Sequence, residues 1–147
     1  MGCKFGMQPV YRAYPSGRTS KIHAIVDALG TPFHFILTGG QIHHASAAID
    51  LLAELEIAGI TILADRAYGS QTIRKNITNQ KASYTIPPRE NCASPWPCDF
   101  YTCKECHLVE CFFNKLTVFR RVATRYDKLA VSFLAFIHLA SIGILLK

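Results

Sequence analysis

The chain has 147 residues, of which 50% are hydrophobic and 18% charged. This composition fits one globular domain with its own core and excludes disorder as the main state. A net charge of +6 makes a polyanion such as nucleic acid, or an anionic membrane surface, a fitting partner. The first residues lack the continuous apolar segment of a secretory signal, so a reducing, cytoplasmic location is expected.

The first two thirds of the sequence predict an α/β order of elements. In residues 1–16 the apolar side chains recur neither at every second position, as in a strand, nor every 3.6 positions, as in a helix. We interpret this segment as a poorly ordered leader. Segments 20–27 and 32–38 predict an antiparallel hairpin. A helix is expected over 45–55, a strand buried on both faces over 60–64, a helix capped by Ser70 to about residue 79, and a strand over 82–86.

Two helices are expected in the last third. Residues 107–121 place large apolar side chains three and four positions apart, so one side should pack on the sheet. Residues 129–146 are nearly all apolar and predict a buried C-terminal helix. This segment is at the short limit of the roughly 20 apolar residues that cross a membrane, and a membrane span is the alternative.

Asp65 and Glu110 are the carboxylates best placed for chemistry. Asp65 follows the predicted strand 60–64, at the edge where open α/β sheets place their sites, although a turn Asp is the alternative. Glu110 lies opposite the apolar stripe of the helix 107–121, where an ordinary solvated face is the alternative. Two carboxylates beside a basic surface suggest metal-assisted phosphoryl chemistry, since Mg²⁺ prefers oxygen ligands.

A run of cations follows Glu110 and is predicted to bind the DNA backbone. For two or three of these five cations, an ordinary solvated position or an interaction with the dipole at a helix C-terminus is an equally good explanation. The residues are Lys115, Arg120, Arg121, Arg125 and Lys128.

Four cysteines offer a competing interpretation. Cys98, Cys103, Cys106 and Cys111 follow a C-x4-C-x2-C-x4-C spacing, and four thiolates could close a tetrahedral zinc site. A C-x2-C without a second spaced pair is a weak signal, so zinc is not the cofactor that we expect.

Several segments, in the same order, resemble the DDE transposases of bacterial insertion sequences of the Y-R-E-K signature type. They are 17–23 (GRTSKIH), 26–30 (VDALG), 63–68 (LADRAY), 86–89 (IPPR), 107–116 (HLVECFFNKL) and 119–127 (FRRVATRYD). The resemblance runs from about residue 17 to the C-terminus. It therefore divides the chain into a non-matching leader, 1–16, and the C-terminal part of a DDE catalytic domain, 17–147.

The resemblance implies an RNase H-like domain with C-terminal helices. In this family three acids hold two Mg²⁺ (or Mn²⁺) ions, cleave DNA at the element's ends and join it to target DNA. Asp65 matches the second acid and Glu110 the third. The first Asp of the family lies on the first strand, and residues 1–16 contain no Asp; Asp27 matches a turn residue instead. We therefore expect a truncated domain that lacks the first strand and has a gap in its sheet.

The signature on the catalytic helix also departs from the family. Cys103, Cys106 and Thr117 stand at the positions of its Tyr, Arg and Lys, so phosphate positioning should be weakened. The isolated chain is expected to be inactive. We interpret it either as a decayed copy of a transposase or as the downstream frame of a transposase that is made by ribosomal frameshifting. The alternative is a non-catalytic DNA-binding fragment that modulates an intact transposase. The resemblance implies a bacterial cytoplasmic protein that is associated with the nucleoid and has DNA (element ends and target) as its partner. It leaves open an upstream-frame product or an intact transposase as a further partner, and an oligomer. No membrane partner is expected.

Overall fold

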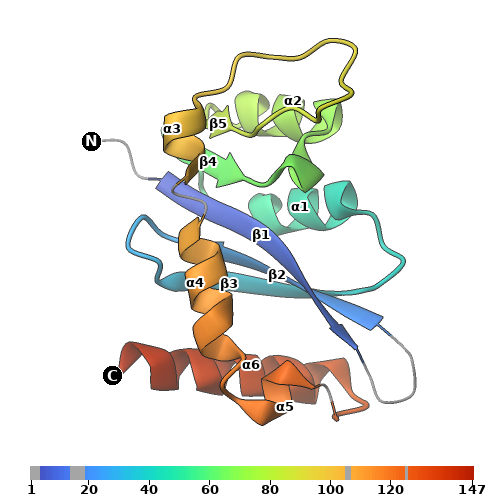
Figure 1. Cartoon of the computed structure of the whole chain (residues 1–147), viewed down its shortest axis with the longest axis vertical. Coiled ribbons are helices and arrows are strands. Elements are labelled where there is room, and N and C mark those ends of the chain that lie inside the picture. Colours follow the sequence, from blue (N-terminus) through green and yellow to red (C-terminus); the bar gives the residue numbers. More distant parts are fainter. Residues whose placement is uncertain (1–3, 14–18, 105–106, 125) are drawn as a thin grey trace.

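The computed structural model describes residues 4–13, 19–104, 107–124 and 126–147 (Figure 1). The helices and strands, in chain order, are β1 (Lys4–Ala13), β2 (Thr19–Val26), β3 (Pro32–Gly39), α1 (His44–Ala53), β4 (Thr61–Ala64), the 3₁₀ helix η1 (Arg66–Tyr68), α2 (Gln71–Asn79), β5 (Ser83–Thr85), α3 (Phe100–Cys103), α4 (His107–Leu116), α5 (Arg120–Ala123) and α6 (Ala130–Leu145). This order confirms the predicted α/β class.

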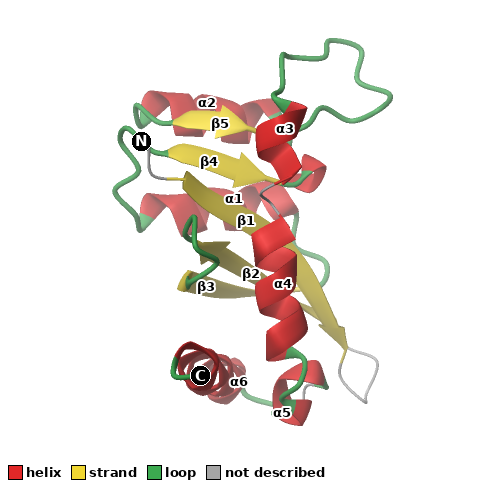
Figure 2. Cartoon of the chain, turned by 60° about the vertical axis from the view of Figure 1, so that its left-hand side comes forward, coloured by secondary structure: helices red, strands yellow, loops and turns green. Residues whose placement is uncertain are grey.

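A five-stranded sheet in the order β3-β2-β1-β4-β5 forms the centre of the molecule. Strands β1, β2 and β3 pair antiparallel, whereas β4 runs parallel to both β1 and β5. Helices α1 and α2 lie on one face of the sheet, and α4 and α6 lie on the other (Figure 2). The carboxyl end of β4, where Asp65 follows, therefore lies near the middle of a covered sheet.

The first strand is present, in contrast to the predicted leader and gap. Residues 4–13 form β1, which pairs with β2 from Gly6 opposite Val26 to Ala13 opposite Thr19, and with β4 over residues 4–7. The prediction is therefore wrong for these residues. The alternation of apolar and polar residues that marks a strand is obscured here because β1 contains a glycine and a proline. Pro9 is tolerated because it lies beyond residues 4–7, the part of β1 that pairs with β4.

The hairpin and the cap of α2 form as predicted. In the β2–β3 turn the Asp27 carboxylate accepts hydrogen bonds from the backbone amides of Leu29 and Thr31, each at 2.8 Å. Gly30 adopts φ 80° there, a backbone conformation that favours glycine. Ser70 Oγ accepts a hydrogen bond from the Ile73 amide at 3.3 Å and so caps α2.

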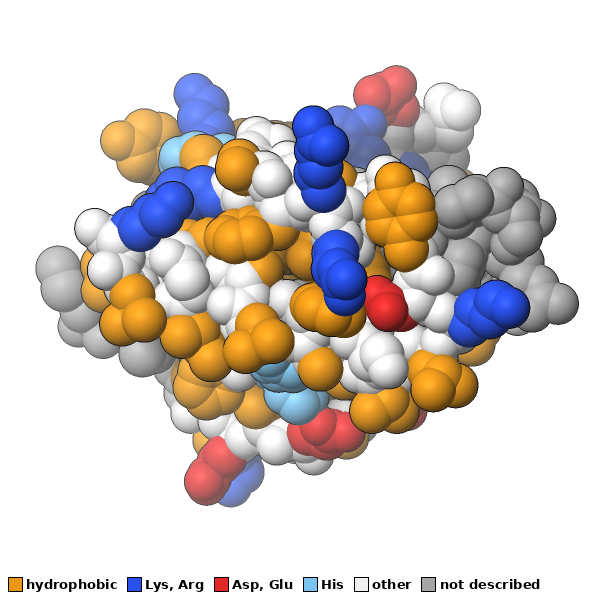
Figure 3. Space-filling model, turned by 90° about the horizontal axis from the view of Figure 1, so that it is seen from below, with side chains coloured by type: hydrophobic (Ala, Val, Ile, Leu, Met, Phe, Trp, Pro, Cys, Tyr) orange, Lys and Arg blue, Asp and Glu red, His pale blue; other side chains and the backbone are white. Residues whose placement is uncertain are grey.

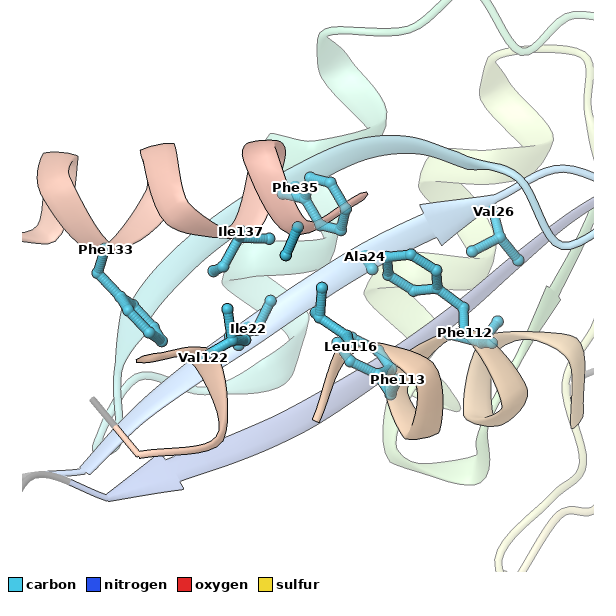
Figure 4. Packing of buried hydrophobic residues seen from close by; sticks show 12 residues of the cluster. Ile22, Ala24, Val26, Phe35, Phe112, Phe113, Leu116, Val122, Phe133 and Ile137 are labelled. Atoms are coloured by element: carbon cyan, nitrogen blue, oxygen red, sulfur yellow. The ribbon is translucent and has the colours of Figure 1, made fainter. Parts of the chain in front are cut away.

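Two hydrophobic clusters hold the layers together, one on each face of the sheet. On the α1–α2 face the buried cluster consists of Ile25, Ala48, Leu51, Leu52, Ile57, Ile62, Ala64, Tyr68, Ile73, Ile77 and Ile86. On the α4–α6 face it consists of Ile22, Ala24, Val26, Phe35, Val109, Phe112, Phe113, Leu116, Val122, Phe133, Ile137 and Ala140 (Figure 4). Strand β2 contributes to both clusters because successive side chains of a strand point to opposite faces.

The predicted single helix 107–121 is divided in two. Helix α4 ends at Leu116, and α5 starts at Arg120 after Phe119, which has extended backbone angles. The break turns Phe119 towards the cluster on the α4–α6 face, against which it packs half-buried. The helix is therefore interrupted at the residue whose aromatic side chain packs against the core.

Helix α6 is not the buried helix that its composition predicts. Phe133, Ile137 and Ala140 are buried, but Val131 is 80% exposed and Leu139 is 62% exposed. Figure 3 shows this side of the molecule, where hydrophobic side chains lie beside Lys and Arg side chains at the surface. No helix in the described part of the chain is long and apolar enough to cross a membrane.

Candidate active site

Asp65 begins a tight turn directly after β4, as its place in the sequence predicts. It is the N-cap of η1, and its Oδ1 accepts a hydrogen bond from the Arg66 amide at 2.6 Å. The Tyr68 amide donates to the Asp65 carbonyl at 2.9 Å and closes the turn. The Asp65 side chain is therefore held by its own turn at the edge of the sheet.

A buried polar group fixes this turn to the centre of the sheet. The Tyr68 hydroxyl is hydrogen-bonded to His23 Nδ1 at 2.8 Å, and His23 Nε2 lies 2.9 Å from the Thr38 hydroxyl. His23 and Tyr68 are both completely buried. Because each ring nitrogen has a partner, the imidazole is satisfied in the core and links β2 and β3 to the Asp65 turn.

Glu110 is positioned by the opposite, apolar side of α4. Val109, Phe112 and Leu116 are buried against the sheet, whereas Glu110 is exposed. The amphipathic spacing of the sequence therefore correctly predicts the face that carries Glu110.

The structure brings Asp65 and Glu110 into one pocket. Both line a hollow of about 260 Å³ at the end of β4, which Ala64, Pro87, Cys103, Lys104 and His107 also line. The two carboxylates come from distant parts of the sequence, so their approach is a property of the fold. The sequence predicts that the two residues face the same edge of the sheet, and they line one pocket there.

Sequence reasoning missed two residues of this pocket. Lys104 places a cation beside the carboxylates, and His107 Nδ1 is 2.6 Å from the Lys104 carbonyl. Because a carbonyl only accepts hydrogen bonds, Nδ1 is the donor in this contact. The signal for His107 was available, since it lies three residues before Glu110 and helical residues three apart share a face.

Strand β1 supplies no carboxylate to the pocket, because the sequence contains no Asp or Glu before Asp27. Its Gly6 lies opposite Leu63 of β4, and a Cβ built on Gly6 would be 2.8 Å from Val109 Cγ2. Among the described residues no group of three or more His, Cys, Asp or Glu side chains could hold a metal ion. Asp65 and Glu110 supply the oxygen ligands that Mg²⁺ prefers.

Most of the predicted DNA-binding cations lie away from this pocket. Arg120 and Arg121 are on α5, at the opposite end of α4 from α3 (Figure 1), and Lys115 is in the last turn of α4. The Arg121 guanidinium lies 4.6 Å from the centre of the Phe136 ring. Lys128 is exposed before α6, and Arg125 lies outside the described residues.

Other cations, which the sequence did not single out, lie in a hollow next to the Asp65 turn. Arg66 and Arg89 line a neighbouring hollow of about 460 Å³ with Trp96 and Glu90. Arg66 forms an exposed ion pair with Glu90 at 2.8 Å. Positive charge is thus available from the segments after β4 and β5, in a hollow that begins at the residue after Asp65.

The cysteine spacing does not produce a four-thiolate arrangement in the part of the chain that is described. Cys98 and Cys103 are close together, with Sγ atoms 3.3 Å apart. Cys111 lines a different hollow with Leu29, and Cys106 lies outside the described residues.

The chain matches one family model and one curated relative. The model of the family described as "Transposase DDE domain" matches residues 8–95. A protein of Brucella ovis, named as a transposase for insertion sequence element IS6501, is 38% identical over 130 residues, which cover 88% of this chain and 99% of that protein. This chain belongs to the transposase DDE domain family. The predicted resemblance to insertion-sequence DDE transposases is thereby confirmed, and the family match begins within β1.

Two solved structures share the fold of this transposase-family chain. One is a chain of the simian T-cell lymphotropic virus intasome in complex with PP2A regulatory subunit B56 gamma, with TM-score 0.60 and 16% identity over 91% of this chain. The other is the catalytic core domain of BIV integrase, with TM-score 0.50 and 10% identity over 95% of this chain. The chain spans 46% of the intasome chain and 81% of the integrase core. The predicted RNase H-like fold is confirmed, with its first strand in place.

Proposed function

We propose that this chain acts in the transposition of an insertion sequence, with Asp65 and Glu110 as the carboxylates that face the DNA strand. The observation that carries the proposal is their convergence in one pocket from two different layers of the fold. A divalent ion bound there, Mg²⁺ or Mn²⁺, would supply Lewis-acid polarisation of a phosphate oxygen. The Lys104 ammonium in the same pocket would attract that phosphate and offset the charge of the carboxylates.

We further propose that the isolated chain does not cleave DNA. Two-ion cleavage needs enough negative ligands to hold both cations in line with the scissile phosphate, and β1 contributes none. Losing a metal ligand should remove several kcal/mol of transition-state stabilisation, and about 1.4 kcal/mol corresponds to a tenfold change in rate.

The test uses the purified chain, Mg²⁺ or Mn²⁺, and DNA that carries the element's ends. We expect no nicking by the chain, and weak Mn²⁺ binding in electron paramagnetic resonance that is lost in the Asp65→Ala, Glu110→Gln variant. Metal-dependent nicking by the unmodified chain, absent from that variant, would overturn the proposed inactivity. Equal Mn²⁺ binding by both proteins would overturn the assignment of the carboxylates.

A designed variant sharpens this test by adding the carboxylate that β1 lacks. Gly6 lies next to Leu63 in the sheet and against Val109, the neighbour of Glu110. In Gly6→Asp, Val109→Ala the smaller residue at position 109 makes room for the new side chain. We expect Mn²⁺ affinity to rise at least about tenfold, since even indirect ligand contacts change metal affinity by 10–100-fold. The Gly6→Asn, Val109→Ala protein is the matched control, and an equal gain in it would contradict the proposal.

The exposed cations on α5 favour a second candidate function, a DNA-binding fragment that modulates an intact transposase. Arg120 and Arg121 lie on the surface beyond the C-terminal end of α4, whereas Glu110 is in the first turn of that helix. Two results would support it. DNA affinity should survive Asp65→Ala. In Arg120→Ala, Arg121→Ala the slope of log K for DNA against log salt concentration should be shallower by about 2. Lys75→Ala, which removes an exposed cation on α2, is the control. Unchanged salt dependence in the double variant would contradict it.

A further inference from the structure

Two thiols lie together, and one of them lines the Asp65–Glu110 pocket. The Sγ atoms of Cys98 and Cys103 are 3.3 Å apart, and both residues are half-buried. Cys103 also lines the pocket. The DNA chemistry proposed above uses carboxylates and cations, so it gives these sulfur atoms no role.

The local backbone explains why residues 98 and 103 meet. Asp99 is the N-cap of α3, and its carboxylate accepts hydrogen bonds from the Tyr101 amide at 3.0 Å and from the Thr102 hydroxyl. The Cys103 amide donates to the Asp99 carbonyl at 3.0 Å. These bonds close the turn between the two cysteines, so their sulfur atoms are brought together by a structured helix start.

We propose that Cys98 and Cys103 form a redox-active dithiol, which a low-molecular-weight disulfide such as oxidised glutathione converts to an intramolecular disulfide. One protein thiolate attacks the small disulfide, forms a mixed disulfide and releases one glutathione thiol. The second protein thiolate then displaces the other glutathione thiol. Two protein sulfurs are oxidised, the glutathione disulfide is reduced to two thiols, and the protein loses two hydrogen atoms.

The geometry favours this pair over other described pairs. A disulfide bond is about 2.05 Å long, so the two sulfur atoms need to approach by little more than about 1 Å. Cys92 lines the hollow that contains Trp96, and Cys111 lines the hollow that contains Leu29, whereas Cys103 lines the carboxylate pocket. The chemical competitor is Cys106, because Cys103 and Cys106 have the C-x-x-C spacing of thiol–disulfide enzymes.

Trypsin separates the two pairings. Cleavage after Arg89, Lys104 and Lys115 yields peptide 90–104, which contains Cys92, Cys98 and Cys103, and peptide 105–115, which contains the other two cysteines of this region. A disulfide between Cys98 and Cys103 therefore stays within peptide 90–104. A disulfide between Cys103 and Cys106 joins the two peptides.

The experiment equilibrates the full chain with reduced and oxidised glutathione, traps remaining thiols with a maleimide, and maps tryptic peptides by mass spectrometry. We expect two of the six cysteines to escape the maleimide. Peptide 90–104 should carry the maleimide on Cys92 alone, should be two hydrogen atoms lighter than the same singly labelled peptide with two free thiols, and should not be cross-linked to another peptide. Cys98→Ser and Cys103→Ser should each abolish this species, and Cys92→Ser and Cys111→Ser should retain it.

Three results would overturn the proposal. They are a cross-link between the two peptides, an unchanged intrapeptide disulfide in Cys98→Ser, and purified protein with stoichiometric zinc that blocks these thiols. The mapping of the unmodified chain does not depend on folding of the variants. It also needs no DNA, so it stands apart from the function proposed above.

Discussion

The two faces of the sheet support the two carboxylates by different means. On the α1–α2 face, the Asp65 turn is tied to the core by a hydrogen-bonded aromatic residue, Tyr68, whose partner is His23. On the α4–α6 face, Glu110 is carried by a helix whose buried contacts are apolar, including Phe112 and Leu116. The pocket therefore lies where two separately packed layers meet, and it can be disturbed from one side by hydrogen-bond loss and from the other by cavity formation.

The largest expected effect comes from the apolar face. Phe112 is 2% exposed, and its ring stacks on Phe35 with centroids 5.7 Å apart. Phe112→Ala should lower the free energy of unfolding by about 3–5 kcal/mol, because the cavity adds to the lost burial. Urea denaturation measures this change. Phe100→Ala, at a 64% exposed position, is the control and should change stability by less than about 0.5 kcal/mol. Equal effects of the two substitutions would show that α4 is not packed as described.

The hydrogen-bonded face should respond less strongly but more locally. Tyr68→Phe keeps the ring and removes the hydroxyl that meets His23 Nδ1, so stability should fall by about 1–3 kcal/mol. Amide hydrogen exchange should accelerate most at Arg66, whose amide donates to Asp65. Tyr126→Phe, at an exposed position, is the matched control. Uniform acceleration across the whole chain would mean that the hydroxyl stabilises the core without fixing the Asp65 turn.

The same contrast explains what the sequence could predict. Asp65, Glu110 and the Ser70 cap follow from local rules, namely strand end, helix face and N-cap, and each lies where those rules put it. Strand β1 could not be predicted from its period, because its backbone is fixed by pairing with β4 over residues 4–7 and with β2 over residues 6–13. The exposure of α6 could not be predicted either, since a helix that is apolar all round does not reveal which side is covered.

The distance between the cations and the carboxylates has a similar cause. A basic run in the sequence carries no information about which end of α4 faces the pocket. The helix direction places Glu110 in its first turn and Lys115 in its last turn. Arg66, which is next to Asp65 in sequence, reaches the neighbouring hollow through a turn instead.

A smaller effect is expected from the cap of α2, which supports the Asp65 face from the outside. Ser70→Ala removes the side-chain acceptor of the Ile73 amide, and helix caps contribute about 1 kcal/mol. Ser70→Asp should keep most of the stability because its carboxylate can also cap. Thermal denaturation of both variants tests this. A Ser70→Asp protein as unstable as Ser70→Ala would indicate that the cap geometry is not used.

The smallest effect is expected on the outer side of α6, where apolar residues face the surface. Val131 is 80% exposed and Ile142 is 53% exposed, so Val131→Lys and Ile142→Lys should each change the free energy of unfolding by about 0.5 kcal/mol or less. Ile137→Ala, on the buried side of the same helix, should cost about 2–5 kcal/mol. This pair of results measures how sharply α6 is divided between a packed side and a surface side. A loss of several kcal/mol in either Lys variant would place that side chain in a contact within the folded protein. A small effect in Ile137→Ala would instead mean that α6 is not docked on the sheet through that side.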